Sequence, residues 1–169
     1  MASSPVLACS KVLVEKEWTI AFVESATAGK MSYEFSTVPD SGKILVGGMV
    51  CYDACMKEEI LRVPHALIAT FTPESEEVTK EMAIRFSKFA QADICVAVTG
   101  LTAPGGSETP EKPVGTIFIY VILPFKHFDR RFEFEGSPEN IVDQAINATA
   151  SVILEEIKRK GIGSYLVKE

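Results

Sequence analysis

The sequence predicts an α/β domain in which helices cover a central sheet. Short apolar runs alternate with amphipathic segments along the chain, a pattern typical of layered α/β domains. Two of the runs, Ile94–Val98 and Thr116–Leu123, are continuous and rich in β-branched residues, as in strands that are buried on both faces. The segment Asp129–Glu135 instead alternates charged and aromatic residues, which predicts an exposed strand at the edge of the sheet.

The first part of the chain is predicted to alternate between helix and strand. A first helix has Ser4 as its N-cap and Pro5 at the first helical position, where the missing N–H of proline costs nothing. After it we expect, in order, a strand at Thr19–Val23, a short helix at Thr27–Phe35, a turn at Val38–Gly42 and a strand at Ile44–Tyr52. Gly47 and Gly48 in this second strand indicate a bulge or a close backbone approach.

Three further helices are predicted from their start signals. Asp53 is expected to cap a helix that runs to about Leu61 and buries the face formed by Met56, Ile60 and Val63. A second helix is expected to begin with Thr72 as cap and Pro73 at its first position. Acidic residues follow near its positive end, namely Glu74, Glu76 and Glu77. Its core side is expected to consist of Val78, Met82, Ile84, Phe86 and Phe89. Ser137 and Pro138 open the last helix.

Length and charge restrict the class of protein. With 169 residues, the chain is predicted to form one domain over residues 1–169. Its 17 basic and 23 acidic residues give a net charge of −6, which argues against nucleic acid as the main partner. No apolar run approaches the roughly 18 residues of a membrane span, and the N-terminus lacks the basic and apolar regions of a signal peptide. We therefore expect a cytoplasmic protein that does not bind a membrane.

The four cysteines, Cys9, Cys51, Cys55 and Cys95, do not suggest a metal site. None belongs to a Cys-x-x-Cys pair, and the chain has two histidines. A zinc site usually needs four such ligands at close spacing. We expect buried free thiols, with neither metal nor organic cofactor.

A long loop, Gly100–Gly115, separates the two buried strands. It holds four glycines and three prolines, so that it forms neither helix nor strand. Loops of this length are usually functional or disordered, and a glycine-rich loop that leaves a buried strand can bring backbone N–H groups to a phosphate or an oxyanion. A solvated surface loop is the alternative.

Three clusters of polar or small residues follow predicted strands. The first is Glu24–Gly29, in which Ser25 or Thr27 would present a hydroxyl to a ligand or simply cap a helix. The second is Tyr52–Lys57, whose lysine is either a desolvated base or a solvated surface cation. The third is the long loop, with Thr99, Thr102, Gly105, Gly106 and Lys112. Ligands bind at the carboxyl ends of strands in open α/β sheets, and neither histidine belongs to a cluster, so a hydroxyl nucleophile would need lysine as its base.

These clusters resemble motifs of the CinA C-terminal domain family, whose active members are nicotinamide mononucleotide deamidases. The similarity runs from about Trp18 to Lys158 and includes, in the family's order, Glu24-Ser-Ala-Thr-Ala-Gly29, Gly48-Met-Val-Cys-Tyr-Asp-Ala-Cys-Met-Lys57, Ser75-Glu-Glu-Val78, Thr99-Gly-Leu-Thr-Ala-Pro-Gly-Gly106 and Glu111-Lys-Pro-Val-Gly-Thr116. The resemblance implies a three-layer α/β/α sandwich with a mostly parallel central sheet and an antiparallel edge. It also implies a homo-oligomer, most simply a dimer.

The resemblance implies hydrolysis of a carboxamide on a pyridine nucleotide. Ser25 would be the nucleophile and Lys57 the base, with Thr27 as the fallback hydroxyl and Tyr52 positioning the amide. The family motifs further imply a set of substrate-binding residues, among which the loop N–H groups near Gly105 and Gly106 would hold a phosphate or an oxyanion. The full set is Glu24, Gly29, Gly48, Thr99, Gly100, Thr102, Gly105, Gly106 and Lys112.

Several positions depart from the family pattern. Ala26 and Ala28 replace a cysteine and a glycine, and Thr102-Ala103 replaces Ala-Gly. Active members carry two arginines near the start of the last helix, where this chain has Pro138 and Val142-Asp143. Because an arginine there is suited to clamp a phosphate, its loss is expected to lower phosphate affinity. There are therefore two alternatives to a deamidase. The first is a nucleotide-binding or interaction module without turnover, and the second is an amidase that acts on another small amide, which can be one without a phosphate.

Overall fold

The computed structural model describes residues 2–163, with side chains up to residue 160; Met1 and residues 164–169 of the predicted domain lie outside the described residues. A five-stranded sheet with the order β2-β1-β3-β4-β5 forms the centre of the molecule. Its strands are β1 (Ile20–Glu24), β2 (Leu45–Val50), β3 (Ile94–Gly100), β4 (Thr116–Leu123) and β5 (Lys126–Glu133). β1 pairs in parallel with β2 and β3, whereas β4 pairs antiparallel with both β3 and β5.

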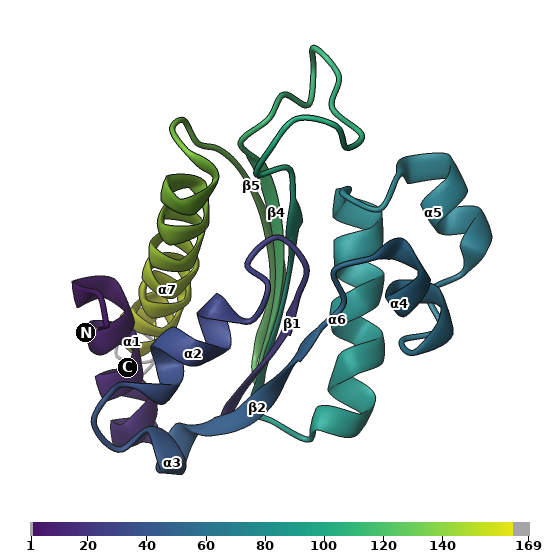
Figure 1. Cartoon of the computed structure of the whole chain (residues 1–169). Helices are drawn as coiled ribbons and strands as arrows, with labels where there is room; N and C mark the ends of the chain where they lie inside the picture. Colours follow the sequence, from purple (N-terminus) through teal and green to yellow (C-terminus); the bar gives the residue numbers. More distant parts are fainter. Residues whose placement is uncertain (1, 164–169) are drawn as a thin grey trace.

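Helices cover both faces of this sheet, which confirms the predicted α/β class and its layers (Figure 1). One face carries α1 (Ser4–Lys16), α2 (Lys30–Ser36) and α7 (Pro138–Gly163), with the single turn α3 (Ser41–Ile44) beside them. The other face carries α4 (Ala54–Glu59), α5 (His65–Phe71) and α6 (Glu76–Ala90).

Two apolar cores lie between these layers because strand side chains alternate across the sheet. Phe22 and Val96 point into the core under α1, α2 and α7, whereas Val23 and Ala97 point into the core under α6. Burial on both faces explains the continuous apolar runs. The predicted irregularity in β2 is confirmed: the register with β1 shifts between Ile20 and Ala21, and a Cβ on Gly48 would lie 2.0 Å from the Ser32 hydroxyl.

Several predicted helix starts are wrong. α1 has Ser3, not Ser4, as its N-cap. α2 begins at Lys30 rather than Thr27, because Gly29 has a φ of +94° and breaks the helix there. α6 begins after the N-cap Ser75, whose hydroxyl accepts from the Val78 N–H.

The segment before α6 also differs from the prediction. The proposed cap Thr72 has a φ of +71° and ends the short helix α5, which the sequence did not predict. Strand β5 begins at Lys126, three residues before the predicted Asp129. The predicted core residues Met56, Ile60 and Phe89 are 37%, 51% and 53% exposed, so the inward faces of α4 and α6 differ from those expected.

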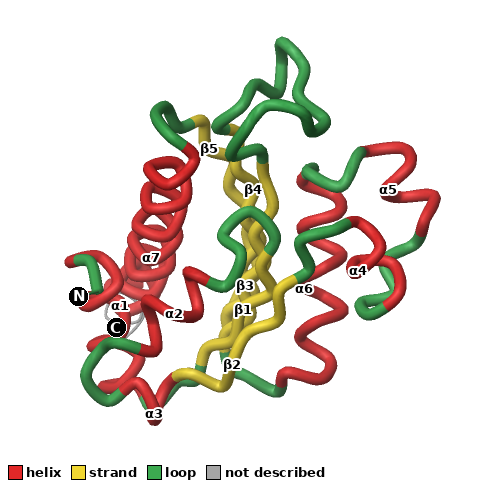
Figure 2. The backbone as a smooth tube through the Cα atoms, viewed as in Figure 1, coloured by secondary structure: helices red, strands yellow, loops and turns green. Residues whose placement is uncertain are grey.

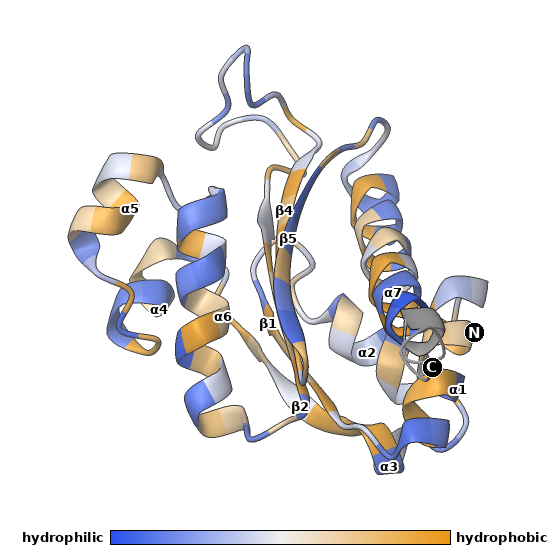
Figure 3. Cartoon of the chain, turned by 180° about the vertical axis from the view of Figure 1, so that it is seen from behind, coloured by the Kyte–Doolittle hydropathy of each residue, from blue (hydrophilic) through white to orange (hydrophobic). Residues whose placement is uncertain are grey.

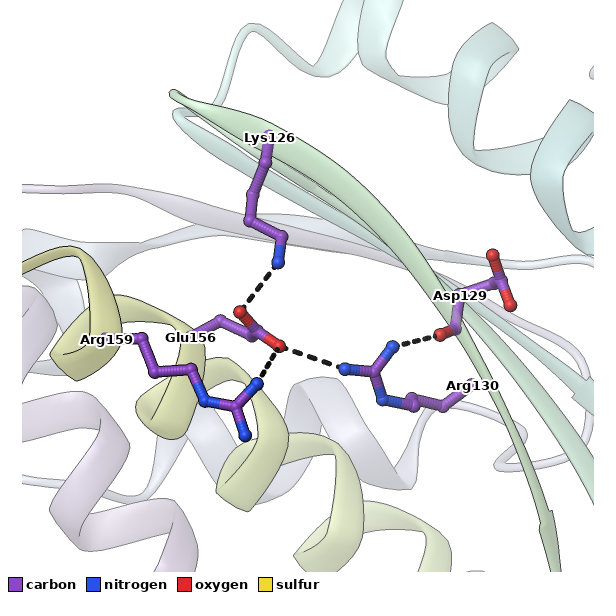
Figure 4. Close-up of polar contacts among 5 residues, drawn as sticks. All are labelled: Lys126, Asp129, Arg130, Glu156 and Arg159. Atoms are coloured by element: carbon purple, nitrogen blue, oxygen red, sulfur yellow. Dashed lines mark hydrogen bonds and ion pairs between the residues drawn. The ribbon is translucent and has the colours of Figure 1, made fainter. Parts of the chain in front are cut away.

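An ion cluster fastens α7 to the edge of the sheet. The buried Glu156 carboxylate accepts from Lys126 Nζ at 2.7 Å, from Arg130 Nη2 at 2.9 Å and from Arg159 Nη1 at 3.4 Å (Figure 4). Lys126 and Arg130 belong to β5, which carries many hydrophilic residues (Figure 3). The cluster therefore holds the polar edge strand against the helix layer.

Three of the four cysteines are buried, and the fourth is exposed. Cys9, Cys51 and Cys95 are buried free thiols, as predicted, but Cys55 is exposed on α4. Burial raises the pKa of the Cys9 thiol to about 12, so this thiol is inert at neutral pH. Within residues 2–163, no helix combines the length and the apolar character that crossing a bilayer requires.

Candidate functional site

Three segments that follow parallel strands meet at one edge of the sheet. Glu24 pairs with Val50 and with Val98, so β1 and β2 end at the level of Val98 in β3, which continues to Gly100. In Figures 1 and 2, the long loop that leaves β3, residues 101–115, stands at the top of the view, and the loops of residues 25–29 and 51–53 lie below it, near the middle. This is the position where open α/β sheets bind ligands, and it brings together all three clusters that the sequence singled out.

The centre of this edge is a serine–lysine pair. Lys57 Nζ lies 3.1 Å from Ser25 Oγ, within hydrogen-bond distance. The same nitrogen also lies 3.2 Å from the Cys51 carbonyl oxygen and 3.5 Å from that of Tyr52. A neutral amine has two N–H bonds, which these two carbonyls can accept, so its lone pair is left for the Ser25 hydroxyl.

The local sequence places Lys57 there. Asp53 caps α4 as predicted, accepting from the Cys55 N–H at 2.8 Å, and Lys57 lies one turn further along the helix. Its side chain is fully buried, which excludes the surface-cation alternative. Burial lowers the pKa of the Lys57 ammonium, and the charges of Glu74, Cys51 and Asp53 offset part of that shift. A lysine with a lowered pKa is suited to act as a general base.

The lowered pKa also predicts how stability depends on pH. Below its folded-state pKa, Lys57 holds a proton in the folded and unfolded states alike, and the folded state bears the full cost of the buried charge. Between that pKa and the ordinary value of 10.5, only the unfolded state holds the proton, so the stability of the wild type rises with pH in this window.

We therefore expect Lys57→Met to raise the free energy of unfolding at neutral pH by about 1 kcal/mol or more, because below pH 10.5 the folded state bears the cost either of burying the charged amine or of removing its proton, and the apolar chain has neither cost. This advantage should shrink as pH rises towards 10.5, which urea titrations of both proteins at several pH values will show. Taking the difference between the two proteins cancels the contribution of Cys9 and Cys95, whose pKa shifts do not involve Lys57. An advantage that does not change with pH would contradict the assignment.

A cavity of about 280 Å³ lies beside this pair. It is formed by the three loops and by the segment that precedes α6. Its lining consists of Ser25, Ala26, Tyr52, Glu74, Gly100, Leu101, Thr102, Ala103, Pro104, Gly105 and Gly106. Of the residues predicted for the site, the structure thus brings Ser25, Tyr52, Gly100, Thr102, Gly105 and Gly106 to one cavity, with Lys57 behind Ser25.

Four predicted residues serve the fold around the cavity instead of lining it. Glu24 is buried, and its carboxylate accepts from the Thr27 hydroxyl at 2.6 Å and from the Gly29 N–H at 2.9 Å. The Thr27 hydroxyl therefore donates away from the cavity and is a poor alternative nucleophile. Gly48 lies beneath α2, where it leaves room for Ser32.

Two other predicted residues, Thr99 of β3 and Lys112 of the long loop, form contacts with α6 and with the segment before it. The Thr99 hydroxyl lies 2.7 Å from that of Thr79 on α6, and both residues are buried. Lys112 Nζ donates to the Thr72 hydroxyl at 2.6 Å, to the Glu74 carbonyl oxygen at 2.9 Å and to the Ser107 hydroxyl at 2.8 Å. Neither residue lines the cavity; Lys112 ties the loop to the segment before α6.

The loop amides differ from the expected arrangement. The Gly105 N–H donates to Glu108 Oε1 at 2.8 Å, so a carboxylate of the loop itself occupies the donor that the sequence assigned to a substrate anion. The Ala26 N–H, directly after the nucleophile, donates to no described residue, and Ala26 is one of the residues that line the cavity. A free amide next to the nucleophile is a common oxyanion donor, so Ala26 is the better candidate.

Sequence reasoning missed Ala26 and Glu74 as site residues. The suggested role of Ala26 depends on its backbone N–H, a group that every residue except proline has, so the amino-acid sequence gives no signal for it. Glu74 was predicted to lie in the first turn of a helix, but it precedes the N-cap Ser75 and borders the cavity. Its proximity to the long loop is a tertiary contact that local patterns do not encode. Among the described residues, no three His, Cys, Asp or Glu side chains gather as a metal site would require.

Comparison with known proteins shows the family of the chain and agrees with its fold. The CinA C-terminal domain family matches residues 4–157 of the chain. A "CinA-like protein" of Thermotoga maritima is 34% identical over 149 residues, which is 88% of this chain and 35% of that protein. A protein of the same description from Desulfotalea psychrophila is 37% identical over 131 residues, which is 78% of this chain and 32% of that protein. The chain thus spans about a third of the length of these relatives.

Solved structures share this architecture. A CinA superfamily protein from Klebsiella pneumoniae superposes with a TM-score of 0.86 at 24% identity, covering 92% of this chain and 96% of that one. A CinA superfamily protein from Escherichia coli gives a TM-score of 0.82 at 26% identity, with coverages of 90% and 88%. The layered sheet and the site edge therefore belong to a fold that occurs in several bacteria.

Proposed function

Because the chain belongs to the CinA C-terminal domain family, we propose that it is an amidohydrolase that converts nicotinamide mononucleotide into nicotinate mononucleotide and ammonia. The observation that carries this proposal is the 3.1 Å approach of Lys57 Nζ to Ser25 Oγ beside a cavity. The substrate itself comes from the family resemblance, and the pair supplies the chemistry that amide hydrolysis requires.

The first half of the reaction forms an ester on Ser25. The Ser25 oxygen attacks the carboxamide carbon while its proton passes to the neutral Lys57 amine, giving a tetrahedral intermediate with a negative oxygen. In this mechanism the Ala26 N–H donates to that oxygen. The Lys57 ammonium then returns the proton to the amide nitrogen, the carbon–nitrogen bond breaks, and ammonia leaves.

The second half regenerates the serine. A water molecule attacks the ester carbon and gives its proton to Lys57, and the carbon–oxygen bond to Ser25 breaks as Lys57 returns that proton to the serine oxygen. The acid product leaves. Tyr52, which is 67% exposed at the cavity, positions the amide from the rim. One residue thus acts as base and then as acid in both halves.

The test is to incubate the wild type with nicotinamide mononucleotide and to measure ammonia and nicotinate mononucleotide. We expect equal amounts of the two products. Hydroxylamine added during turnover should intercept the ester and yield a hydroxamate, whereas Ser25→Ala should yield none. Binding of the nucleotide by calorimetry without any ammonia would instead favour the nucleotide-binding module.

A further inference from the structure

The cavity has an unusual distribution of charge for a site that binds a phosphate ester. Among the described residues that line it, Glu74 alone has a formally charged side chain. None of the described lysines and arginines borders the cavity, although both residue types are the usual partners of a phosphate group. The ligand therefore meets a carboxylate where a phosphate would need a cation.

Glu74 is held so that part of its carboxylate is free. Ser107 donates its hydroxyl proton to Oε2 at 2.5 Å, and no described residue donates to Oε1. The residue is half-buried at the cavity wall, where the charge is less screened than at an open surface.

Neither of the two nearby lysines, Lys57 and Lys112, forms a direct ion pair with this carboxylate, although its charge favours the protonated form of both and so opposes the lowering of their pKa by burial. Lys112 reaches the Glu74 carbonyl oxygen and not its carboxylate, and it lies outside the lining. Lys57 lies behind Ser25, where it acts as a neutral base in the proposed mechanism. The loop adds a further acid, since Glu108 occupies the Gly105 N–H. A substrate phosphate would thus find acidic groups beside it and would have to displace one of them to reach that amide.

The ring of an N-alkylated nicotinamide has a full positive charge, which free nicotinamide lacks. We infer that Glu74 is a specificity-determining residue that selects amides on a cationic pyridine ring, and that the site accepts the unphosphorylated nicotinamide riboside at least as well as the mononucleotide. This inference rests on the proposed function and narrows its substrate class. It makes the ring charge, rather than the phosphate, the group that is recognised.

The experiment separates ring charge from phosphate with two pairs of compounds. Nicotinamide and 1-methylnicotinamide differ by one methyl group and one charge, and nicotinamide riboside and its mononucleotide differ by the phosphate. Dissociation constants for all four are measured by calorimetry with wild type, Glu74→Gln and Glu77→Gln. The amide at position 74 keeps an acceptor for Ser107, and Glu77 is an exposed residue of α6 whose replacement changes the net charge equally.

We expect Glu74→Gln to raise the dissociation constants of 1-methylnicotinamide and of the riboside by about fivefold to tenfold. The dissociation constant of neutral nicotinamide should stay within about twofold of the wild-type value. The mononucleotide should lose less affinity than the riboside, because the substitution also removes the repulsion between Glu74 and the phosphate. Glu77→Gln should leave the dissociation constants of all four compounds unchanged. Equal weakening of nicotinamide and 1-methylnicotinamide, or a wild type that binds the mononucleotide more than about tenfold tighter than the riboside, would overturn the inference.

Ammonia release is measured on the same four compounds to separate the two proposals. If the wild type hydrolyses none of them but binds cations through Glu74, the proposed hydrolysis fails and the recognition rule holds. If it hydrolyses the mononucleotide with a kcat/KM far above that of the riboside, the hydrolysis holds and the recognition rule fails.

Discussion

Ser25→Ala and Lys57→Met will each lower kcat for ammonia release by about a thousandfold or more. The first change removes the atom that forms the ester, and the second removes the base that lies 3.1 Å from it. KM should change little in either variant, because neither side chain is expected to hold the ring or the ribose. Coupled detection of ammonia at saturating substrate measures both rates.

The double variant decides whether the two residues act as a unit. If Lys57 works only through Ser25, then Ser25→Ala combined with Lys57→Met will be no slower than the slower single variant. Losses that multiply would assign independent roles to the two residues. Lys80→Met, at an exposed position of α6, is the control for removing a lysine and should retain full activity. Full activity of Ser25→Ala would refute the mechanism.

The pH dependence of kcat follows from the same pair. Lys57 must be neutral to accept the Ser25 proton, so activity should rise as pH passes upward through its pKa. Because burial lowers that pKa, the rise should occur below the range of an ordinary lysine. A kcat that does not rise anywhere between pH ~5 and pH ~10 would indicate another base.

The sheet was predictable because its signal is local. Ile94–Val98 and Thr116–Leu123 became β3 and β4 with little change, since burial on both faces requires every side chain of a strand to be apolar. The helix before β3 was harder. Thr72 and Pro73 form a sound start signal. The residue that caps α6 is nevertheless Ser75, three residues after Thr72, whose hydroxyl accepts a hydrogen bond from the Val78 N–H. Thr72 and Ser75 are both suitable N-cap residues, and the local sequence alone does not determine which of them begins the helix.

The site was predictable in outline, since Ser25 and Lys57 both follow strands that end at one edge. The burial of Lys57 was not predictable. The apolar residues Met56 and Ile60 suggested which face of α4 points inward, yet both are exposed while Lys57 is fully buried. α4 has only six residues, so its orientation depends on the contacts of the lysine nitrogen with Ser25 and with two backbone carbonyls. Such long-range polar contacts leave no periodic pattern in the sequence.

Glu24 illustrates the same limit, because its position after a strand suggested substrate binding whereas its contacts are structural. Both carboxylate oxygens are used: Oε2 accepts from Thr27, Gly29 and Met31, and Oε1 accepts from the N–H and the hydroxyl of Ser32 at 2.8 and 2.5 Å. The carboxylate thus holds the turn after Ser25 and the first amides of α2, where a negative charge is favoured by the helix dipole. The same group that fixes the nucleophile loop also starts the helix.

Glu24→Ala is therefore expected to lower the free energy of unfolding by about 3–5 kcal/mol, since it leaves several buried donors unpaired. Glu24→Gln should lower the free energy of unfolding by less, because the carbonyl oxygen of the glutamine still accepts from one group of donors. Glu15→Ala, at an exposed position of α1, should change stability by no more than about 0.5 kcal/mol. Urea titrations measure all three, and kinetics on the folded fraction separate the two possible roles. If Glu24 bound substrate, Glu24→Gln would raise KM at unchanged stability; as the acceptor for five donors, it should reduce stability and leave the KM of the folded enzyme within about twofold.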